Sequence, residues 1–394
     1  MKINFWTIRY TLINVFYFVA FATIHGFAAV FLLSKGFTNT EVGMALALAN
    51  ILSVVGQPLV AGIVDRSDTV TNRRVLMASA LIMLAGALGL SVLNGPKVLI
   101  FAVYVLIYTV QFIAMSILIA ISFEYRAYGC KHNFGLARGL GSASFAVTAA
   151  VMGPIIEKTG PTVNMYVTVG VMALLFLIAF FFRLPDGAVK ENTDAGDTEA
   201  PTDSFFKFVK KYPMFMLFML GVACVFFSHN MLNDYLIQII RNLGGGETEL
   251  GYASFLQAIL ELPVMALIVF VLRKINAKAV LIFSMFAFLL KVVIMYFATG
   301  LPGMYLSQSI QLFAYAVFIP TAAYYADKIM KGGDKVKGQA YINCAITLGG
   351  VFSNIVCGPV LDKHGVSAML MVGIAVCLAG VIIATVSMTG KERS

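Results

Sequence analysis

The sequence predicts an all-α membrane protein, and three observations carry this prediction: its hydrophobicity, its evenly spaced apolar stretches and its internal repeat. Hydrophobic residues make up 60% of the 394 residues and charged residues only 12%, about half the charged fraction of a soluble globular protein. Apolar stretches of about 20 residues, the length of a membrane-crossing helix, recur along the chain. Since backbone groups in lipid must bond within their own segment, we expect these stretches to be helices.

Twelve such stretches follow one another. The first is longer than the apolar part of a secretion signal and has no A-x-A cleavage site, so we expect it to be retained. The twelve predicted transmembrane helices cover roughly residues 10–33, 41–64, 75–94, 98–123, 138–156, 162–182, 213–240, 250–272, 279–299, 303–326, 339–360 and 366–388.

A polar stretch divides these helices six and six. The residues from Leu184 to Pro213 are rich in Asp, Glu, Thr and Gly, a composition typical of flexible linkers. The sequence therefore predicts an N-terminal six-helix bundle over 1–183, a cytoplasmic linker over 184–212 and a C-terminal six-helix bundle over 213–394.

The two halves repeat one another. The segment "NTEVGMALALANIL" (39–52) is similar to "ETELGYASFLQAIL" (247–260), and "GPIIEKTG" (153–160) is similar to "GPVLDKHG" (358–365). Each pair lies at the same place in its half, at the entry to the second helix and at the turn after the fifth. Such parallel repeats predict two pseudo-symmetric bundles that rock against each other around a central site.

The basic residues predict the orientation in the membrane. The predicted cytoplasmic segments hold 22 of the 28 Lys and Arg residues, the opposite side holds five, and Lys291 lies inside a span. This asymmetry follows the positive-inside rule. We therefore expect a multi-pass protein of the inner membrane with both termini in the cytoplasm, and we attribute the net charge of +9 to this topology and not to nucleic-acid binding.

The loop after the second helix, "GIVDRSDTVTNRR" (62–74), is similar to the signature G-x-x-x-D-R-x-G-R-R of the major facilitator superfamily. Two features differ, since the glycine is one place late and extra residues precede Arg73 and Arg74. The whole chain resembles this family, which implies its twelve-helix fold and a gating role for Asp65 and Arg66. The alternative is that these two residues form a solvated charged turn.

Two further stretches resemble the lactose permease and nucleoside permease branch: "FGLARGLGSASF" (134–145) and "ELPVM" (261–265). The resemblance implies that Glu124, Arg138 and Phe145 bind the solute, with Phe145 where the lactose permease has Trp. The alternative for Glu124 and Arg138 is a salt bridge at the cytoplasmic interface. The resemblance to the permease's coupling residues fails, because Gln311 and Ala314 stand where it has proton-exchanging side chains.

Two charged residues lie near the middle of predicted spans, Glu261 on the eighth helix and Lys291 on the ninth. An unpaired ion at that depth is expensive, so each is expected to face a partner or a polar cavity. The simplest arrangement is that they face each other or share a hydrated site. They are then either proton-coupling residues or a structural salt bridge.

Polar residues also cluster on the seventh helix, in "SHNMLNDYLIQ". Four-residue spacing puts His229 on one face with Asn233, and Asn230 on one face with Asp234. His229 and Asp234 are candidates for proton coupling and the two asparagines for solute binding, unless the cluster is a hydrogen-bonded clasp. On the first helix, His25 is a further coupling candidate or a packing residue.

Amide side chains on the fourth and tenth helices form a third group of candidates. Spacings of three and four place Gln308, Gln311 and Tyr315 on one stripe, and Tyr108 and Gln111 on another. Such groups hydrogen-bond polar solutes without selecting a charge. The alternative is that the aromatic residues serve packing alone.

The sequence shows no P-loop, no metal-ligand spacing and no nucleophile triad. We therefore expect no enzyme and no cofactor. The prediction is a monomeric secondary active transporter that moves a small polar organic solute, a sugar, oligosaccharide or nucleoside, by proton symport and alternating access. The alternatives are proton-coupled efflux of amphipathic compounds and a membrane sensor that binds a solute without moving it.

Overall fold

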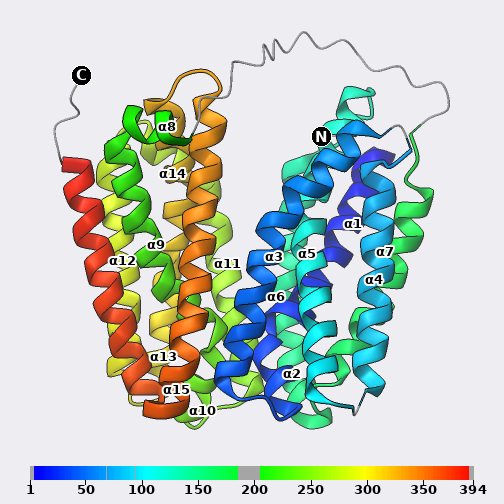
Figure 1. The fold of residues 1–394 in the computed structure, drawn as a ribbon, viewed down its shortest axis with the longest axis horizontal. Coiled ribbons are helices and arrows are strands. Elements are labelled where there is room, and N and C mark those ends of the chain that lie inside the picture. Colours follow the sequence, from blue (N-terminus) through cyan, green and yellow to red (C-terminus); the bar gives the residue numbers. More distant parts are fainter. Residues whose placement is uncertain (1–3, 68, 94, 185–204, 390–394) are drawn as a thin grey trace. The chain divides into compact units, whose positions relative to one another are not determined.

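A computed structural model gives the structure of the protein and describes residues 4–67, 69–93, 95–184 and 205–389. These residues fold into helices (Figure 1), and no strand occurs among them. Residues 185–204 of the predicted linker lie outside the described residues, so its flexibility stays a prediction. The helices are α1 (Phe5–Phe21), the π-helix η1 (Ala22–Gly26), α2 (Ala28–Ser34), α3 (Asn39–Arg66), α4 (Asn72–Val92), α5 (Lys97–Ala127), α6 (Phe134–Thr159), α7 (Val163–Phe181), α8 (Phe205–Lys211), α9 (Pro213–Asp234), α10 (Leu236–Asn242), α11 (Glu247–Leu272), α12 (Ala277–Phe297), α13 (Leu301–Ser309), the 3-10 helix η2 (Ile310–Leu312), α14 (Tyr315–Ile329) and α15 (Asp334–Thr389).

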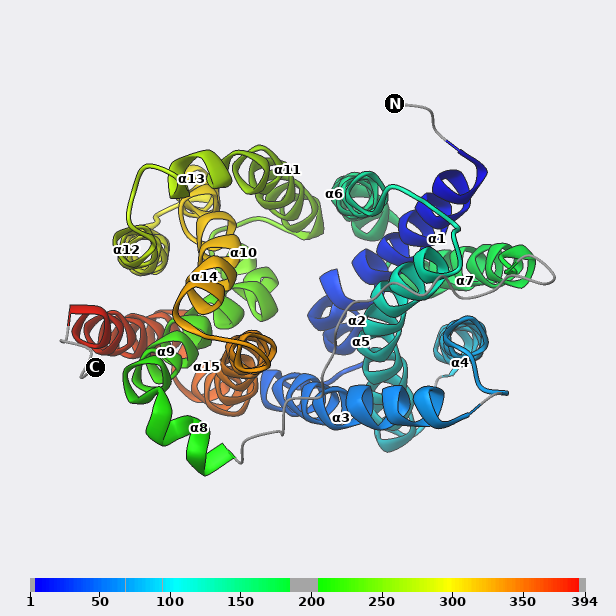
Figure 2. The same cartoon turned by 90° about the horizontal axis from the view of Figure 1, so that it is seen from above.

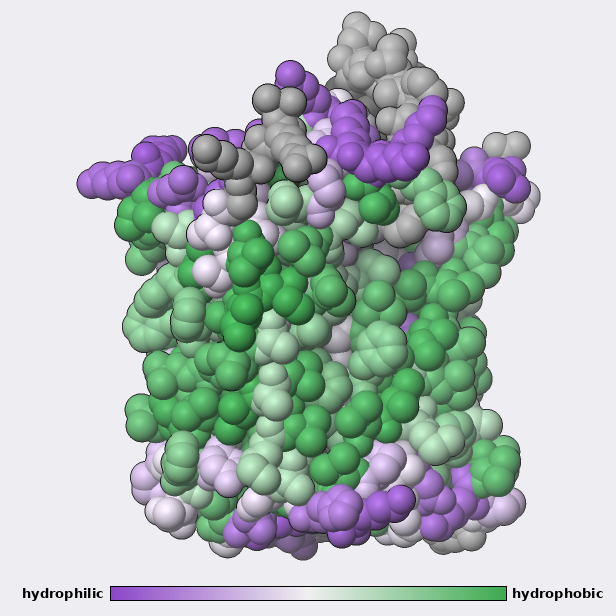
Figure 3. All heavy atoms as spheres, turned by 60° about the vertical axis from the view of Figure 1, so that its left-hand side comes forward, coloured by the Kyte–Doolittle hydropathy of each residue, from purple (hydrophilic) through white to green (hydrophobic). Residues whose placement is uncertain are grey.

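In the described part of the chain, nine helices are long and apolar enough to cross a membrane. One of them, α15, contains a non-helical residue at Gly365, where two helices join across a kink. Figure 3 shows hydrophobic side chains as a broad belt between two hydrophilic margins on the face that it draws. The all-α membrane class is thereby confirmed, while the number of twelve spans stays a prediction.

The chain packs as two compact units. The first comprises 1–37, 48–195 and 246–258, and the second comprises 38–47, 196–245 and 259–394. Each unit therefore contains one short segment from the other half of the sequence. These segments are the amino-terminal parts of α3 and α11.

Within the first unit, α1 packs against α6 and α7, and α4 packs against α5 and α7 (Figure 2). Within the second unit, α9 runs along α15, and α12 contacts α13, α14 and α15. Side chains that cap helix ends fix where several helices begin. Asn4 and Asn133 accept hydrogen bonds from backbone amides in the first turns of α1 and α6, at 2.8 and 2.9 Å, which satisfies amides that have no partner inside the helix.

The internal repeat recurs in the backbone angles. Phe27 interrupts the first helical stretch with φ −114° and ψ 23°, and Tyr235, which is 208 residues later, interrupts the seventh with φ −111° and ψ 21°. Each interruption is followed by a seven-residue helix, α2 or α10. The turns after them contain Gly36 and Gly244 at φ 80° and 82°, a conformation that favours glycine. Related positions in the two halves therefore fold alike.

Three stretches predicted as continuous helices are interrupted. The predictions over 10–33 and 213–240 are wrong at Phe27 and Tyr235, and the prediction over 303–326 is wrong at η2 and the residues that follow it. Hydrophobicity reports that a segment lies in the membrane, but it does not report local changes in hydrogen bonding. Irregular backbone is tolerated at membrane depth where protein groups satisfy it.

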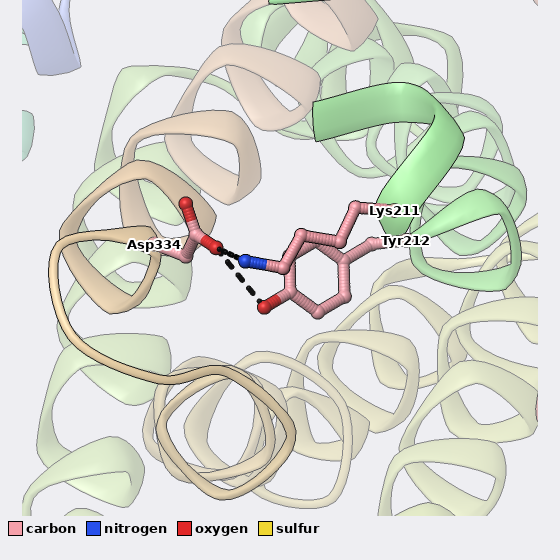
Figure 4. A network of polar contacts seen from close by, with 3 residues as sticks. All are labelled: Lys211, Tyr212 and Asp334. Atoms are coloured by element: carbon pink, nitrogen blue, oxygen red, sulfur yellow. Dashed lines mark hydrogen bonds and ion pairs between the residues drawn. The ribbon is translucent and has the colours of Figure 1, made fainter. Parts of the chain in front are cut away.

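The short helix α8 is anchored to the second unit at the start of α9 and α15. Lys211 forms an ion pair of 2.5 Å with Asp334, and the Tyr212 hydroxyl donates to the same carboxylate at 3.1 Å (Figure 4). This hydrogen bond to Asp334 raises the pKa of Lys211, and burial raises the pKa of Tyr212. The fully buried Phe208 contacts Tyr212. The end of the linker is thus fixed to the second unit.

Candidate functional site

A chain of hydrogen bonds joins the two mid-span charges of the second unit through one amide. The Lys291 ammonium on α12 donates to Gln311 Oε1 at 2.7 Å, and Gln311 Nε2 donates to Glu261 Oε1 on α11 at 2.8 Å. Lys291 is fully buried and Gln311 is 2% exposed. The structure therefore brings together the charged pair expected from the sequence, with Gln311 between them.

The bridging amide matches the charge on each side. Its carbonyl oxygen faces the donor Lys291, and its NH₂ group faces the acceptor Glu261. Charge-assisted hydrogen bonds of this kind are about twice as strong as neutral ones. A change in the charge of Glu261 would therefore alter the preferred orientation of the amide and, through it, the environment of Lys291.

The local backbone explains the position of Gln311. The α-helix α13 ends at Ser309, and Gln311 lies on the 3-10 turn η2 before α14 begins at Tyr315. Ser307 donates to the backbone carbonyl of Lys291 at 2.8 Å and joins α13 to α12. Irregular helical turns are frequent where a helix presents a functional group. Gln308, on α13, is fully buried.

His229 on α9 lies in a second polar cluster of the same unit. Its ring stacks on Tyr315 with centroids 5.2 Å apart, and its Nε2 atom contacts Asn233 Nδ2 at 3.1 Å. The side chain is 5% exposed, and its Nδ1 atom has no hydrogen-bond partner among the described residues. An unpartnered polar atom in the interior costs free energy, so this nitrogen is a candidate contact for a bound solute.

Asn230 and Asp234 on α9 face α15. Asn230 donates to the carbonyl of Ile346 at 3.2 Å, and Asp234 accepts from Asn354 at 2.8 Å. These contacts tie α9 to α15, and the choice between the two interpretations of the cluster stays a prediction. Asn354 was not among the residues singled out from the sequence, although a polar residue within an apolar stretch is a signal that could have identified it.

In the first unit, His25 lies on the π-helix η1 and hydrogen-bonds through Nδ1 to the Tyr108 hydroxyl on α5. Phe21 contacts His25 with ring centroids 4.7 Å apart and Phe145 with centroids 6.0 Å apart. The structure therefore brings together three of the predicted residues, because Phe21 contacts both His25 and Phe145, and His25 contacts Tyr108. A π-helical turn cannot be read from residue spacing, which explains why η1 escaped prediction.

Gln111 and Arg138 have local partners in the same unit. Gln111 Nε2 donates to the carbonyl of Ala20 at 3.0 Å. The Arg138 guanidinium lies over the Phe18 ring at 4.4 Å, which is a cation–π contact. Glu124 accepts from Asn72 at 2.8 Å. The contacts seen for Glu124 and Arg138 thus lead to different partners, and their joint role in solute binding stays a prediction.

The predicted gating residues Asp65 and Arg66 are exposed at the end of α3. Asp65 lines a pocket of about 280 Å³ between α3, α4 and α5, together with Gln57, Asn72 and Ser116. In the part of the chain that the structure describes, no group of three His, Cys, Asp or Glu residues could hold a metal ion.

Comparison with known proteins places the chain in a family. The model of the MFS 1-like family matches residues 7–372. No curated protein sequence matches the chain. Solved structures with a similar fold include a mutant of the nucleoside transporter NupG, at a TM-score of 0.80 and 15% identity, covering 98% of this chain and 100% of that one.

Two other solved structures share the fold at lower similarity. A peptide transporter POT mutant has a TM-score of 0.73 at 11% identity, covering 96% of this chain and 93% of that one. A bacterial homologue of the human lysosomal transporter Spinster has a TM-score of 0.66 at 14% identity, covering 98% and 92%.

The family match and the membrane-spanning helices thus define a multi-pass membrane transporter and not an enzyme. The chain belongs to the MFS 1-like family of the major facilitator superfamily.

Proposed function

We propose that this transporter moves a small polar organic solute, a sugar, oligosaccharide or nucleoside, by proton symport across the inner membrane. Its termini lie in the cytoplasm and it works as a monomer. The observation that carries the proposal is the hydrogen-bonded chain Glu261–Gln311–Lys291, because it joins a group that can exchange a proton to groups that can bind a solute. The nucleoside transporter NupG, which shares the fold, supports the choice of a hydrophilic solute.

Protonation of Glu261 couples the proton to the solute in this proposal. The ionised carboxylate accepts from Gln311 and holds the amide oxygen toward Lys291. Once protonated, Glu261 no longer attracts the amide NH₂ group with a charge, and Lys291 then needs another acceptor. A solute hydroxyl or carbonyl oxygen supplies that acceptor, so proton and solute are bound together.

Solute recognition uses polar and aromatic groups of each unit. In the second unit, His229 has an unpartnered Nδ1 atom, contacts Asn233 through Nε2 and stacks on Tyr315. The amides of Gln308 and Asn230 are further candidates. In the first unit, the candidates are Glu124, Arg138, Phe145, Tyr108 and Gln111. His25 and Asp234 are candidates for further proton exchange, and Asp65 and Arg66 for gating.

The test combines a solute screen with one substitution. Thermal-shift screening of the purified protein against sugars, nucleosides and organic acids identifies a solute, and uptake of that labelled solute into proteoliposomes follows. Glu261→Gln is expected to abolish accumulation driven by a pH gradient while exchange of solute across the membrane continues, since the amide cannot take up a proton. The exposed Asp327→Asn is the matched control and is expected to accumulate solute like the wild type.

Full accumulation by the Glu261→Gln variant at normal expression would reject Glu261 as the coupling residue. Uptake assays with cationic dyes separate this proposal from proton-coupled efflux of amphipathic compounds. Gradient-driven extrusion of a dye, with no response to any hydrophilic solute, would favour efflux.

A further inference from the structure

The carboxylate of Asp362 on α15 holds the first residues of α3. Its Oδ1 atom accepts from the backbone and side-chain nitrogens of Asn39 at 3.2 and 2.8 Å. Its Oδ2 atom accepts from the backbone nitrogen and hydroxyl of Thr40 at 2.8 and 2.6 Å. A carboxylate at the positive end of a helix forms charge-assisted hydrogen bonds. Both partners belong to the second unit.

The first unit contains the same contact between repeat-related residues. Glu157 on α6 accepts from the backbone nitrogen of Thr248 on α11 at 3.0 Å. Glu157 precedes Asp362 by 205 residues, and Thr40 precedes Thr248 by 208, which are the offsets of the internal repeat. The same arrangement thus occurs twice. In each case, a carboxylate within a repeated Gly-Pro segment, 153–160 or 358–365, accepts from the first residues of another helix.

Glycines bring these helices together at backbone distance. A Cβ atom on Gly43 would lie 2.3 Å from the carbonyl oxygen of Asn354, and one on Gly358 would lie 2.7 Å from that of Asn39. The first unit matches this, because a Cβ atom on Gly251 would lie 2.3 Å from the carbonyl oxygen of Ala149. The Tyr235 hydroxyl also lies close to Gly43 and Gly358, and Gln238 donates to Asn39 at 2.9 Å. Each acidic residue is thus the charged acceptor in a close contact between helices.

Neither helix needs a distant carboxylate to satisfy its first turn. Thr38 and Glu41 form a capping box before α3, with Thr38 N donating to Glu41 at 2.8 Å and Glu41 N donating to the Thr38 hydroxyl at 3.2 Å. Gly246 N likewise donates to Glu249 at 2.7 Å before α11. Asp362 and Glu157 therefore add a connection between helices beyond what capping requires. Both acids are exposed, so water can replace their partners when the contact opens.

We propose that Asp362 and Glu157 are gating residues of the transport cycle. They close the contacts between α3 and α15 and between α11 and α6 at the membrane side opposite the basic loops. Because α3 and α11 each continue from one unit into the other, each contact breaks when the protein opens on that side. The proposal rests on the alternating access of the proposed function, but its test needs neither solute nor proton gradient, so its failure would leave the role of Glu261 open.

The experiment measures how often the contact opens in the purified full-length protein. Ala47, one turn after Gly43 on α3, is 3% exposed, and Ala47→Cys places a thiol there whose maleimide labelling reports opening. The native Cys377 is fully buried on the far part of α15 and is the control for unfolding. Mass spectrometry reads both sites, and hydrogen exchange follows the Thr40 and Thr248 amides directly.

Asp362→Asn removes the charge and one acceptor, so labelling at position 47 and exchange at Thr40 are expected to rise about tenfold, the equivalent of losing about 1.4 kcal/mol of contact. Glu157→Gln is expected to raise exchange at Thr248, and the double variant is expected to label fastest. Asp327→Asn, an exposed aspartate on α14 with its own ion pair to Lys335, is the matched control and should leave all rates unchanged.

Two results would overturn the proposal. The first is exchange at Thr40 that rises while labelling at position 47 stays at the wild-type rate, because the carboxylate would then only cap a helix. The second is a wild-type rate at both sites. If Cys377 is also labelled in the Asp362→Asn variant, the milder Thr40→Val variant is measured, because it keeps the carboxylate and loses one hydroxyl donor. Faster labelling at position 47 alone then indicates gating, and faster labelling at both position 47 and Cys377 indicates unfolding.

Discussion

Each half contains a histidine beside a tyrosine, but the two pairs make different contacts. The pairs are His25 on η1 with Tyr108 on α5, and His229 on α9 with Tyr315 on α14. In the first unit, His25 is hydrogen-bonded to the hydroxyl of Tyr108. In the second unit, His229 stacks on the ring of Tyr315, and its Nδ1 atom has no partner among the described residues. The Nδ1 atom of His25 is thus hydrogen-bonded within the protein, whereas the Nδ1 atom of His229 is left for another partner.

The glutamines of the two halves differ in the partners that they bind. Gln111 of the first unit donates to a backbone carbonyl, whereas Gln311 of the second joins a lysine to a glutamate. Side chains bonded to backbone fix a structure, whereas a chain of ionisable groups responds to a proton. The comparison teaches that the two repeated halves hold similar polar residues in different hydrogen-bond arrangements.

The largest expected effect tests the charges of the second unit. Lys291→Met leaves the half-buried Glu261 carboxylate without its balancing charge, which is expected to reduce the free energy of unfolding by about 3 kcal/mol. Adding Glu261→Gln to this variant is expected to restore most of the loss, because no uncompensated charge remains. Thermal unfolding of the detergent-solubilised proteins measures both. A Lys291→Met variant as stable as the wild type would contradict a buried ionic pair.

A smaller effect is expected from the two glutamines. Gln311→Leu removes both contacts of the bridge and is expected to lower the free energy of unfolding by about 1–3 kcal/mol, because charged partners lose their hydrogen bonds. Gln111→Leu removes a contact to one backbone carbonyl and is expected to lose about 0.5–1.5 kcal/mol. Equal losses in paired unfolding measurements would remove the distinction drawn between the halves.

The histidine–tyrosine contact of the first unit should have a measurable but modest coupling. Tyr108→Phe and His25→Phe each delete one side of the hydrogen bond while keeping an aromatic ring. A double-mutant cycle is expected to give a coupling of about 0.5–1.5 kcal/mol. Strict additivity of the two losses would show that the rings pack without a hydrogen bond of consequence.

The smallest expected effect concerns pH, at two sites outside the spans. His132 in the loop before α6 hydrogen-bonds to Ser122 at 2.7 Å, and burial lowers its pKa. His132 binds a proton more tightly in the unfolded chain than in the folded protein. The loop therefore keeps its full stability above about pH 6.5 and loses stability as the pH falls below that value.

The second site is Lys211, whose raised pKa keeps it charged until the pH exceeds about 10.4, so its contribution is constant near neutrality. Hydrogen exchange at pH 7.5 and 5.5, corrected for its intrinsic pH dependence, should show loosening around His132 and none at α8. His132→Gln should abolish the difference. Equal loosening at both places would show that acid acts on the whole protein.

Composition and spacing were sufficient to predict much of the fold. Apolar stretches and the repeated segments indicated an all-helical membrane protein with two related halves, because burial in lipid leaves few alternatives for the backbone. They did not reveal the breaks at Phe27, Tyr235 and η2, which depend on local hydrogen bonding. The domain boundaries at 183 and 213, which follow from the polar stretch between the halves, stay a prediction.

Candidate residues were easier to predict than their partners. Membrane depth alone identified Glu261 and Lys291, because ions there need compensation. The position of the Gln311 amide between them depends on the 3-10 turn η2. Residue spacing on a regular helix does not predict such a turn. Asn354 and Phe21 escaped notice because an asparagine or a phenylalanine in an apolar stretch is a weak signal until its neighbour is known.

The matching interruptions at Phe27 and Tyr235 bear on the ancestry of the protein. Two different residues adopt nearly the same backbone angles at related positions, so the bend is older than the side chains that now occupy it. A single half-length gene that was copied and fused accounts for this.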